Sequence, residues 1–473
     1  MQPGLLLPEI MTFTGGLIVL LAGSFLPKYK QWVARGITAL ILLGALVVAA
    51  WTITDAPQTG FAGTFLIDTA TGTARIMTTF ATLLILGVAS ADIAGLPREA
   101  DTYALMLFAT TGVLVLAGAN DLLIVIVGYL LASIPLYGLI GVAGQALAAE
   151  ATMKFYLLGS LSGIVMLLGV IVLYALAGDT AYAQLTEQLS AAPSAAVGAG
   201  ILCVLIGLLF KAGAAPAHFW IPDAAQSANA TAATFLTTVP KIGALIAIYR
   251  FIGVVATHHN AWLMIIALLA TLSMFLGNLA AYWQHDPRRL LGWSTVAQVG
   301  FLLVPITAIG HSELAAPGLL FYLGAYVLAN IAGFAVSAAL PKHRKLHDYR
   351  GLARARPWLA AALLIALLSL VGIPPTAVFV GKFTTATAAW DGGYGWLALL
   401  VMLNSLLSLF YYLRWFGPAF ARATEHSPSF TLTDKATRWP ATAAVVAATA
   451  SLGLGVLAGL VWTILDGPIS LGT

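Results

Sequence analysis

The sequence predicts an all-α polytopic membrane protein with about fourteen transmembrane helices, arranged as two inverted five-helix repeats with broken seventh and twelfth helices. The 473 residues are 60% hydrophobic and only 8% charged, whereas a soluble domain carries roughly 25% charged residues. Apolar runs of about 20 residues, the length that crosses a bilayer, recur along the whole chain. Glycine and proline interrupt two of these runs. The composition and the apolar runs exclude a soluble enzyme, and the interrupting glycine and proline residues predict the breaks.

The expected spans follow one another without a soluble domain between them. They lie near 5–26, 36–54, 74–96, 102–119, 121–143, 152–177, 195–215, 228–256, 262–283, 291–309, 315–340, 357–388, 392–416 and 439–465. The longest stretches between them, roughly 178–194, 341–356 and 417–438, are too short to fold alone. We therefore expect one membrane domain over residues 1–473.

The seventh and twelfth spans carry helix-breaking residues inside apolar runs. Gly213 and Pro216 interrupt the seventh, and Gly372, Pro374 and Pro375 interrupt the twelfth. Proline lacks a backbone N–H and interrupts a helix. The freed backbone groups are tolerated at membrane depth only when protein or trapped water surrounds them. Both spans are therefore predicted to be broken helices inside a bundle.

These two breaks suggest an internal repeat. Spans four to eight (101–256) and nine to thirteen (257–416) would be equivalent units, each with its fourth helix broken. Helices one to three (1–100) precede them, and helix fourteen (417–473) follows. Because five is an odd number, the second unit is inverted in the membrane. Inverted repeats with broken helices are typical of transporters, whose working site lies near the middle of the membrane.

Three lysines lie in apolar runs: Lys211, Lys241 and Lys382. An ammonium at membrane depth costs at least a few kcal/mol, so it normally faces the bundle interior and marks an ion or proton path. A lysine that reaches the membrane surface is the common alternative, but Lys211 is followed by a break and not by a charged loop. Because an ammonium in apolar surroundings loses its proton more readily than one in water, the three lysines are candidates for a proton relay. His218, after the first break, is either a relay member or a capped loop histidine.

Basic residues gather in the loops after odd-numbered spans. They lie at 28–35, 98, 288–289, 342–356 and 422–438. Arg75 and Arg250, near helix ends, are exceptions. By the positive-inside rule, both termini then face outside and the basic loops face the cytoplasm, with the bacterial inner membrane as the expected location. The pattern reports orientation and does not indicate nucleic-acid binding.

The sequence offers no site for a cofactor. Cys203 is the one cysteine, so there is no disulfide framework and no thiol cluster for zinc or iron–sulfur. No phosphate-binding loop, metal cluster or nucleophile triad stands out. We therefore expect no cofactor, metal or redox chemistry in this chain itself.

Several motifs resemble the antiporter-like, proton-translocating subunits of respiratory complex I, and subunit N most closely. They lie at 210–223, 235–241, 286–301, 349–352, 372–383 and 404–414. The run Gly-Ile-Pro-Pro-Thr with a downstream Gly-Lys-Phe, within 372–383, is fairly specific to this subunit. The resemblance extends over essentially the full length of the chain.

This resemblance implies a membrane-arm subunit of an NADH:quinone oxidoreductase, a translocase that couples electron transfer elsewhere in the complex to proton movement. Lys211, Lys241 and Lys382 fall on the family's channel and central lysines. The implied partners are other membrane-arm subunits, the lipid bilayer and protons. NADH, FMN, iron–sulfur clusters and quinone would belong to partner subunits.

Two departures from the family pattern leave alternatives open. Leu130 stands where the fifth span of the family carries a glutamate, and Ala228-Asn229-Ala230-Thr231 replaces the usual Ala-Pro-Thr-Pro turn. One alternative is a structural subunit of such a complex that does not pump. Another is a module of a membrane hydrogenase, a cation antiporter or an inorganic-carbon uptake system.

Overall fold

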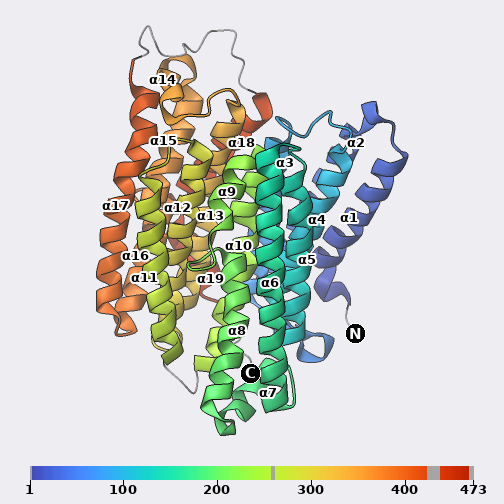
Figure 1. Cartoon of the computed structure of the whole chain (residues 1–473), viewed down its shortest axis with the longest axis vertical. Helices are drawn as coiled ribbons and strands as arrows, with labels where there is room; N and C mark the ends of the chain where they lie inside the picture. The colour runs from blue at the N-terminus through green and yellow to red at the C-terminus, as the bar shows by residue number, and fades with distance from the viewer. Residues whose placement is uncertain (1–2, 257–260, 423–436, 468–473) are drawn as a thin grey trace.

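The computed structural model describes residues 3–256, 261–422 and 437–467 (Figure 1). Within these ranges, 13 helices are long and apolar enough to cross a membrane. Two shorter helices, α15 (Pro357–Val371) and α16 (Ala377–Asp391), together supply the one remaining expected span, the twelfth. The described part also contains a small antiparallel sheet of β1 (Gln58–Gly60) and β2 (Phe65–Ile67). The predicted all-α polytopic fold is confirmed.

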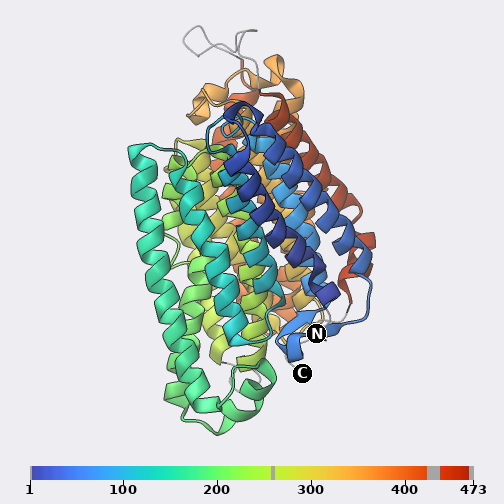
Figure 2. The ribbon, with the colours of Figure 1, turned by 90° about the vertical axis from the view of Figure 1, so that its right-hand side faces the viewer.

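The helices run roughly parallel to one another along the long axis (Figures 1 and 2). The first long helices are α1 (Leu7–Phe25), α2 (Trp32–Thr52), α3 (Thr69–Ala89), α4 (Glu99–Gly118), α5 (Leu122–Gly141), α6 (Ala146–Ala177), α8 (Ser194–Ala212) and α10 (Ala230–Ala256). The later ones are α11 (Ala261–Ala281), α12 (Pro287–Leu303), α13 (Ala315–Ala339), α17 (Gly395–Phe420) and α18 (Arg438–Val456). Short helices connect or extend them: α7 (Tyr182–Gln188), α9 (Trp220–Ser227), α14 (Leu352–Ala355) and α19 (Ala458–Leu465).

The seventh and twelfth spans are broken, as predicted. In the seventh, α8 stops before Gly213 and α9 resumes at Trp220. In the twelfth, α15 stops before Gly372 and α16 resumes at Ala377. Gly213 and Gly372 have φ values of 83° and 90°, which glycine adopts easily because it has no Cβ. Each break thus begins with a left-handed glycine that ends the first half of the span.

The two five-helix units pack in the same pattern. In the first unit α5 packs against α4 and α6, α6 packs against α8 and α9, and α4 packs against α10. In the second unit α12 packs against α11 and α13, α13 packs against α15 and α16, and α11 packs against α17. Each of these contacts in the first unit therefore has a counterpart at the equivalent position in the second. This correspondence supports the proposed repeat.

Helix α10 lies at the centre of the bundle. Its membrane-spanning stretch is entirely buried, and α12 and α13 are almost as well covered. By contrast, α1, α2 and α6 keep most of their apolar surface exposed. Figure 1 shows α1 and α2 at one edge and α17 at the opposite edge. The outer faces are suited to lipid or to neighbouring membrane subunits.

Two buried ion pairs explain the two arginines that depart from the charge pattern of the loops. Arg75 of α3 pairs with Glu9 of α1 at 2.8 Å, and Arg250 of α10 pairs with Asp68, just before α3, at 2.7 Å. All four side chains are buried. Asp68 also caps α3, because its carboxylate accepts a hydrogen bond from the Thr71 N–H. These arginines connect helices and are not free positive charges in loops.

Candidate functional site

Lys241 lies near the middle of α10. Its neighbour Pro240 has no N–H, so the carbonyl of Leu236 lacks its helical partner. The Lys241 Nζ donates a hydrogen bond to that carbonyl at 2.6 Å and lies 4.6 Å from the centre of the Trp220 ring. Lys241 is fully buried. The proline thus leaves an acceptor free for the lysine that follows it.

Lys211 lies in the last turn of α8, directly before the first break. Its Nζ donates to the Ser133 hydroxyl of α5 at 2.8 Å, and the Tyr129 ring centre is 5.7 Å away. Ser133 in turn donates to the carbonyl of Tyr129 at 2.6 Å. Lys211 is buried, and within the described residues it forms no ion pair with a carboxylate. A hydroxyl therefore contacts this lysine where the family pattern suggested an acid.

Leu130, which stands where the family carries a glutamate, is not the α5 residue that binds Lys211. In the structure Leu130 is 40% exposed on the outside of α5, whereas Ser133, three residues later, makes the contact. Tyr129 and Ser133 are four residues apart and share the face of α5 that reaches Lys211, whereas Leu130 points about 60–100° away from them around the helix. The outer face of α5 at Leu130 is thus open to a neighbouring subunit or to lipid.

Lys382 lies in the second half of the broken twelfth span. Its Nζ donates to the carbonyls of Leu370 and Val371, at 3.0 and 2.9 Å, at the end of α15. The last carbonyls of a helix have no partner within the helix and carry its partial negative charge. The centre of the Phe301 ring lies 4.1 Å from the same Nζ. The break therefore supplies acceptors for Lys382, much as Pro240 does for Lys241.

The first break brings Lys211 and Lys241 into one region. Trp220, the first residue of α9, donates from its indole N–H to the carbonyl of Phe210 in the last turn of α8. The face of the same indole lies against Lys241. A Cβ added to Gly213 would lie 3.9 Å from the Lys241 Nζ, so the amine reaches the backbone of the break. Trp220 thus contacts both the turn of α8 that carries Lys211 and the amine of Lys241.

A row of buried polar side chains on α12 and α13 leads from Lys382 toward α10. Gln298 donates to the Leu370 carbonyl at 2.9 Å, the same carbonyl that Lys382 contacts, and accepts from the Tyr322 hydroxyl at 2.6 Å. One turn along each helix, the Tyr326 hydroxyl donates to the carbonyl of Thr237 in α10 at 2.6 Å and lies 3.1 Å from the Thr295 hydroxyl. All these groups are fully buried.

This row was not predicted from the sequence, although a signal was present. Thr295 and Gln298 are three residues apart on α12, and Tyr322 and Tyr326 are four apart on α13. Residues at these spacings share one face of a helix. Polar pairs at helical spacing in apolar spans could therefore have identified the α12–α13 contact, but their partners on α10 and α15 could not be read from the sequence.

His218 lies in the first break, between α8 and α9, and is buried. Its ring packs against Phe219 and Trp293, with centroid distances of 4.4 and 5.4 Å. Neither ring nitrogen makes a hydrogen bond of normal geometry within the part of the chain that the structure describes. The role of His218 as a relay member stays a prediction. The described residues also contain no group of three His, Cys, Asp or Glu side chains placed to hold a metal.

Residues 119–408 match the family described as NADH:quinone oxidoreductase/Mrp antiporter, transmembrane, which is more than half of the chain. The chain belongs to this family. Its members include NADH-quinone oxidoreductase subunit N of a Mycobacterium species (strain JLS), to which the chain is 60% identical over 462 residues, covering 98% of both chains.

Solved structures place the fold in the same family. A chain of respiratory complex I from Thermus thermophilus with bound aureothin superposes with a TM-score of 0.82 at 29% identity, covering 98% of this chain and 100% of that one. A chain of the Mrp complex from a Dietzia species has a TM-score of 0.86 at 21% identity, covering 98% and 96%. The second likeness concerns the fold alone. The family resemblance inferred from the motifs is confirmed.

Proposed function

We propose that this chain is the subunit N of a complex I-like NADH:quinone oxidoreductase and that Lys211, Lys241 and Lys382 carry its protons. Identity of 60% to a protein named NADH-quinone oxidoreductase subunit N, over nearly the whole of both chains, supports the assignment to such a complex. In this proposal NADH, FMN, iron–sulfur clusters and quinone belong to partner subunits. The chain contributes to the translocase by moving protons and by contacting other membrane-arm subunits.

The contrast between the buried arginines and the buried lysines is the observation that supports proton transfer most directly. Arg75 and Arg250 are each bound to a carboxylate, and such pairs fix the charge on both partners. The three lysines instead donate to a hydroxyl or to backbone carbonyls. A neutral amine can keep such a hydrogen bond after it loses a proton. The arginines are therefore suited to structure, and the lysines to repeated protonation.

Each lysine would alternate between ammonium and amine. As an ammonium it is held by its neutral acceptor, Ser133 for Lys211 or the Leu236 carbonyl for Lys241. A proton that leaves Nζ passes to water or to a neighbouring hydroxyl, and the amine lone pair then accepts the next proton. Because burial disfavours the ammonium, a small change in nearby charge is enough to shift this equilibrium. Electron transfer elsewhere in the complex would supply that change.

Protons would pass between Lys241 and Lys382 along the polar contact of α12 and α13. Tyr326 reaches α10, and Gln298 and Tyr322 reach the carbonyl that binds Lys382. Waters held by these groups would complete the connection, since a row of buried polar groups is a site where water is retained. The basic loops would face the cytoplasm by the positive-inside rule, in a bacterial inner membrane.

A structural subunit that does not pump is the second candidate function. It is favoured by the missing acid on α5, because Leu130 occupies that position and Ser133 is the partner of Lys211. This candidate predicts that the lysines can be neutralised without loss of proton translocation. It offers no reason for the acceptors that surround Lys241 and Lys382.

The deciding experiment measures proton translocation by the intact complex in sealed inverted membrane vesicles driven by NADH. Methionine at Lys241 or Lys382 keeps the apolar stem and removes the titratable amine. We expect Lys241→Met and Lys382→Met to assemble and to pump far fewer protons per electron pair. Arg438→Met, which changes a basic residue at the start of α18, serves as the control for loss of one positive charge. Normal pumping by both lysine variants in assembled complex would establish the structural role instead.

A further inference from the structure

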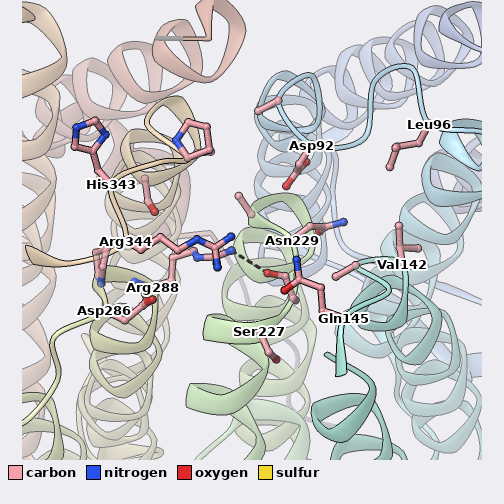
Figure 3. Close-up of a pocket in the computed structure, with 18 residues that line it drawn as sticks. Asp92, Leu96, Val142, Gln145, Ser227, Asn229, Asp286, Arg288, His343 and Arg344 are labelled. Carbon is pink, nitrogen blue, oxygen red and sulfur yellow. Dashed lines mark hydrogen bonds between the residues drawn. The ribbon is translucent and has the colours of Figure 1, made fainter. Parts of the chain in front are cut away.

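A polar cavity of about 380 Å³ lies at the end of the bundle where the loops after α3, α5, α9, α11 and α13 meet. Figure 3 shows around it polar side chains from both five-helix units, together with Asp92 from the loop after α3. The side chains from the two units include Gln145, Asn229, Arg288, His343 and Arg344. The volume far exceeds the roughly 30 Å³ that one water occupies in the liquid. The cavity can therefore hold a group of water molecules on the side of the basic loops.

Asp92 connects this cavity to the helix that carries Lys241. Its carboxylate accepts hydrogen bonds from the backbone N–H of Thr231, at 3.0 Å, and from the Thr231 hydroxyl. Thr231 lies in the first turn of α10, and Asn229 caps the same turn by accepting from Ala232 N–H. Asp92 forms no ion pair within the described residues. A carboxylate that lines the cavity is thus bonded to the start of α10.

From Thr231 a line of hydroxyl groups follows α10 down to Lys241. Thr234, Thr237 and Thr238 complete it, and all of these residues are fully buried. At about 100° per residue, the four threonines and the lysine fall within about 120° of the helix circumference. The ten residues from Thr231 to Lys241 span about 15 Å. One face of the central helix is therefore polar from the cavity to the buried amine.

Buried threonines in membrane helices commonly donate to a carbonyl of the preceding turn, and Thr234, Thr237 and Thr238 do so. Thr234 donates to Ala230 and Thr238 to Thr234, both at 2.6 Å. Each hydroxyl still has lone pairs that accept a hydrogen bond from water or from a neighbour. Two features go beyond this common pattern. The row starts at a carboxylate on a cavity and ends at a titratable amine.

We propose that the cavity is the proton-uptake site of the chain, that Asp92 collects the proton, and that the threonine face of α10 passes it to Lys241. This inference rests on the proposed function, because it requires Lys241 to accept protons. It names Asp92, Thr234 and Thr238 as groups of the entry path.

The proton balance is simple. Water in the cavity gives a proton to the Asp92 carboxylate, which becomes a neutral acid. The acid releases that proton into the row of hydroxyls and intervening water, and the neutral amine of Lys241 takes up a proton at the other end. Asp92 returns to the carboxylate and Lys241 becomes an ammonium. No oxidant, reductant or further reactant is needed.

The setting of Asp92 suits this exchange. Burial raises the pKa of the Asp92 carboxyl above its usual value, against the hydrogen bonds from Thr231, which lower it. The charged and titratable groups that line the cavity with Asp92 are Asp286, which caps α12, Arg288 in the first turn of α12, and His343 and Arg344 after α13. Tyr103 of α4 lies near Asp92, Glu99 and Arg35. Arg288 donates to the carbonyls of Ala228 and Gln226. It therefore does not neutralise Asp92 by a direct ion pair.

Asp92→Asn tests the proposal in inverted vesicles that contain the whole complex. Asparagine retains an oxygen that accepts from Thr231 N–H, so the start of α10 stays capped, but it cannot carry a proton. Because a positioned acid or base contributes about 10²-fold or more to proton transfer, we expect at least about a tenfold lower rate of NADH-driven pumping. The fall should be steepest at alkaline bath pH, where protons are scarce. Added formate, a small weak acid, should restore part of the rate, and Asp92→Glu should pump like the natural chain.

A second set of variants tests the path without touching the cap. Thr234→Val with Thr238→Val removes two hydroxyls at nearly constant shape and should slow pumping at equal assembly. Thr79→Val is the matched control, because Thr79 is a buried threonine of α3 whose hydroxyl, within the described part of the chain, bonds only to carbonyls of its own helix.

The outcomes separate this inference from the proposed function. If Lys241→Met stops pumping while Asp92→Asn and the threonine pair pump normally, protons enter elsewhere and the inference is wrong, although the function stands. If Asp92→Asn is slow but neither formate nor bath pH changes the defect, Asp92 is a structural cap and the inference is again wrong. Normal pumping by Lys241→Met would overturn the proposed function itself.

Discussion

Pro240 and Lys241 are neighbours in α10, and the hydrogen bond that Pro240 cannot make is the one that Lys241 makes. The carbonyl of Leu236 would normally accept from the N–H of residue 240. Because proline has none, the Lys241 Nζ occupies that acceptor at 2.6 Å. The helix defect and the buried charge therefore compensate each other within one turn. Lys382 uses the same principle on a larger scale, since the break after α15 frees the carbonyls that bind it.

This relationship predicts an unusual phenotype for Pro240→Ala. Alanine supplies the missing N–H and removes the clash of a proline inside a helix, so the thermal stability of the complex should hold or rise. The restored N–H competes with Lys241 for the Leu236 carbonyl. One hydrogen bond contributes about 1 kcal/mol, so we expect roughly a fivefold fall in proton pumping. Thermal unfolding and NADH-driven pumping, measured on the same membranes, check both parts. A loss of stability with unchanged pumping would contradict this account.

Much of the fold was predictable because membrane burial leaves a direct mark on composition. Thirteen of the expected spans each contain a helix long enough to cross a membrane, and the one broken at Gly372 corresponds to the two shorter helices α15 and α16. The boundaries were less accurate. The third span was expected at 74–96, but α3 starts at Thr69, because Asp68 caps a polar, threonine-rich first turn. That turn is buried by protein contacts, which hydropathy does not register.

The lysines could be predicted, but their partners could not. An isolated lysine in an apolar run is visible in the sequence, and so is a proline beside it. By contrast, Ser133 and Lys211 are 78 residues apart, and Asp92 and Thr231 are 139 residues apart. Contacts between residues so distant in the sequence depend on which helices pack together, and the sequence pattern of a single helix does not give that packing. The departure from the family at Leu130 therefore showed that the glutamate is missing from α5. It did not show that the hydroxyl of Ser133 contacts Lys211 instead.

The polar contact between α12 and α13 predicts a defect for Gln298→Leu. Leucine breaks the connection between Tyr322 and the carbonyl shared with Lys382. Proton pumping should fall, and the buried Tyr322 hydroxyl left without a partner should cost about 1–3 kcal/mol of stability. The double variant Gln298→Leu with Tyr322→Phe removes that hydroxyl, so stability should recover while pumping stays low. Recovery of both together would mean that this contact only stabilises the fold.

The buried arginines should behave in the opposite way to the lysines. Arg250→Met leaves Asp68 as an uncompensated buried charge, which costs about 3–5 kcal/mol, and should reduce assembly of the complex. Asp68→Asn in the same chain removes that charge and should restore most of the assembly. Once assembled, the double variant should pump at the normal number of protons per electron pair. The amount of complex and the pumping ratio, determined separately, distinguish the two effects, and a low ratio in assembled double variant would place Arg250 on the proton path.

Lys211 should tolerate loss of its amine better than Lys241 or Lys382. Its partner is the hydroxyl of Ser133, which stabilises an ammonium far less than a carboxylate does, and Leu130 adds no charge from α5. Lys241 and Lys382, by contrast, are held by backbone carbonyls that have no helical partner, because of Pro240 in α10 and because of the break after α15. We therefore expect Lys211→Met to lower the number of protons pumped per electron pair less than Lys241→Met or Lys382→Met does at equal assembly. Ser133→Ala is the companion variant, and its effect should not exceed that of Lys211→Met, since it acts only through that lysine.

Equal damage in all three lysine variants would indicate that a carboxylate from a neighbouring subunit reaches Lys211 across the exposed face at Leu130. Leu130→Trp, which would obstruct that face, should then impair pumping as strongly as Lys211→Met, whereas without such a neighbour it should have little effect.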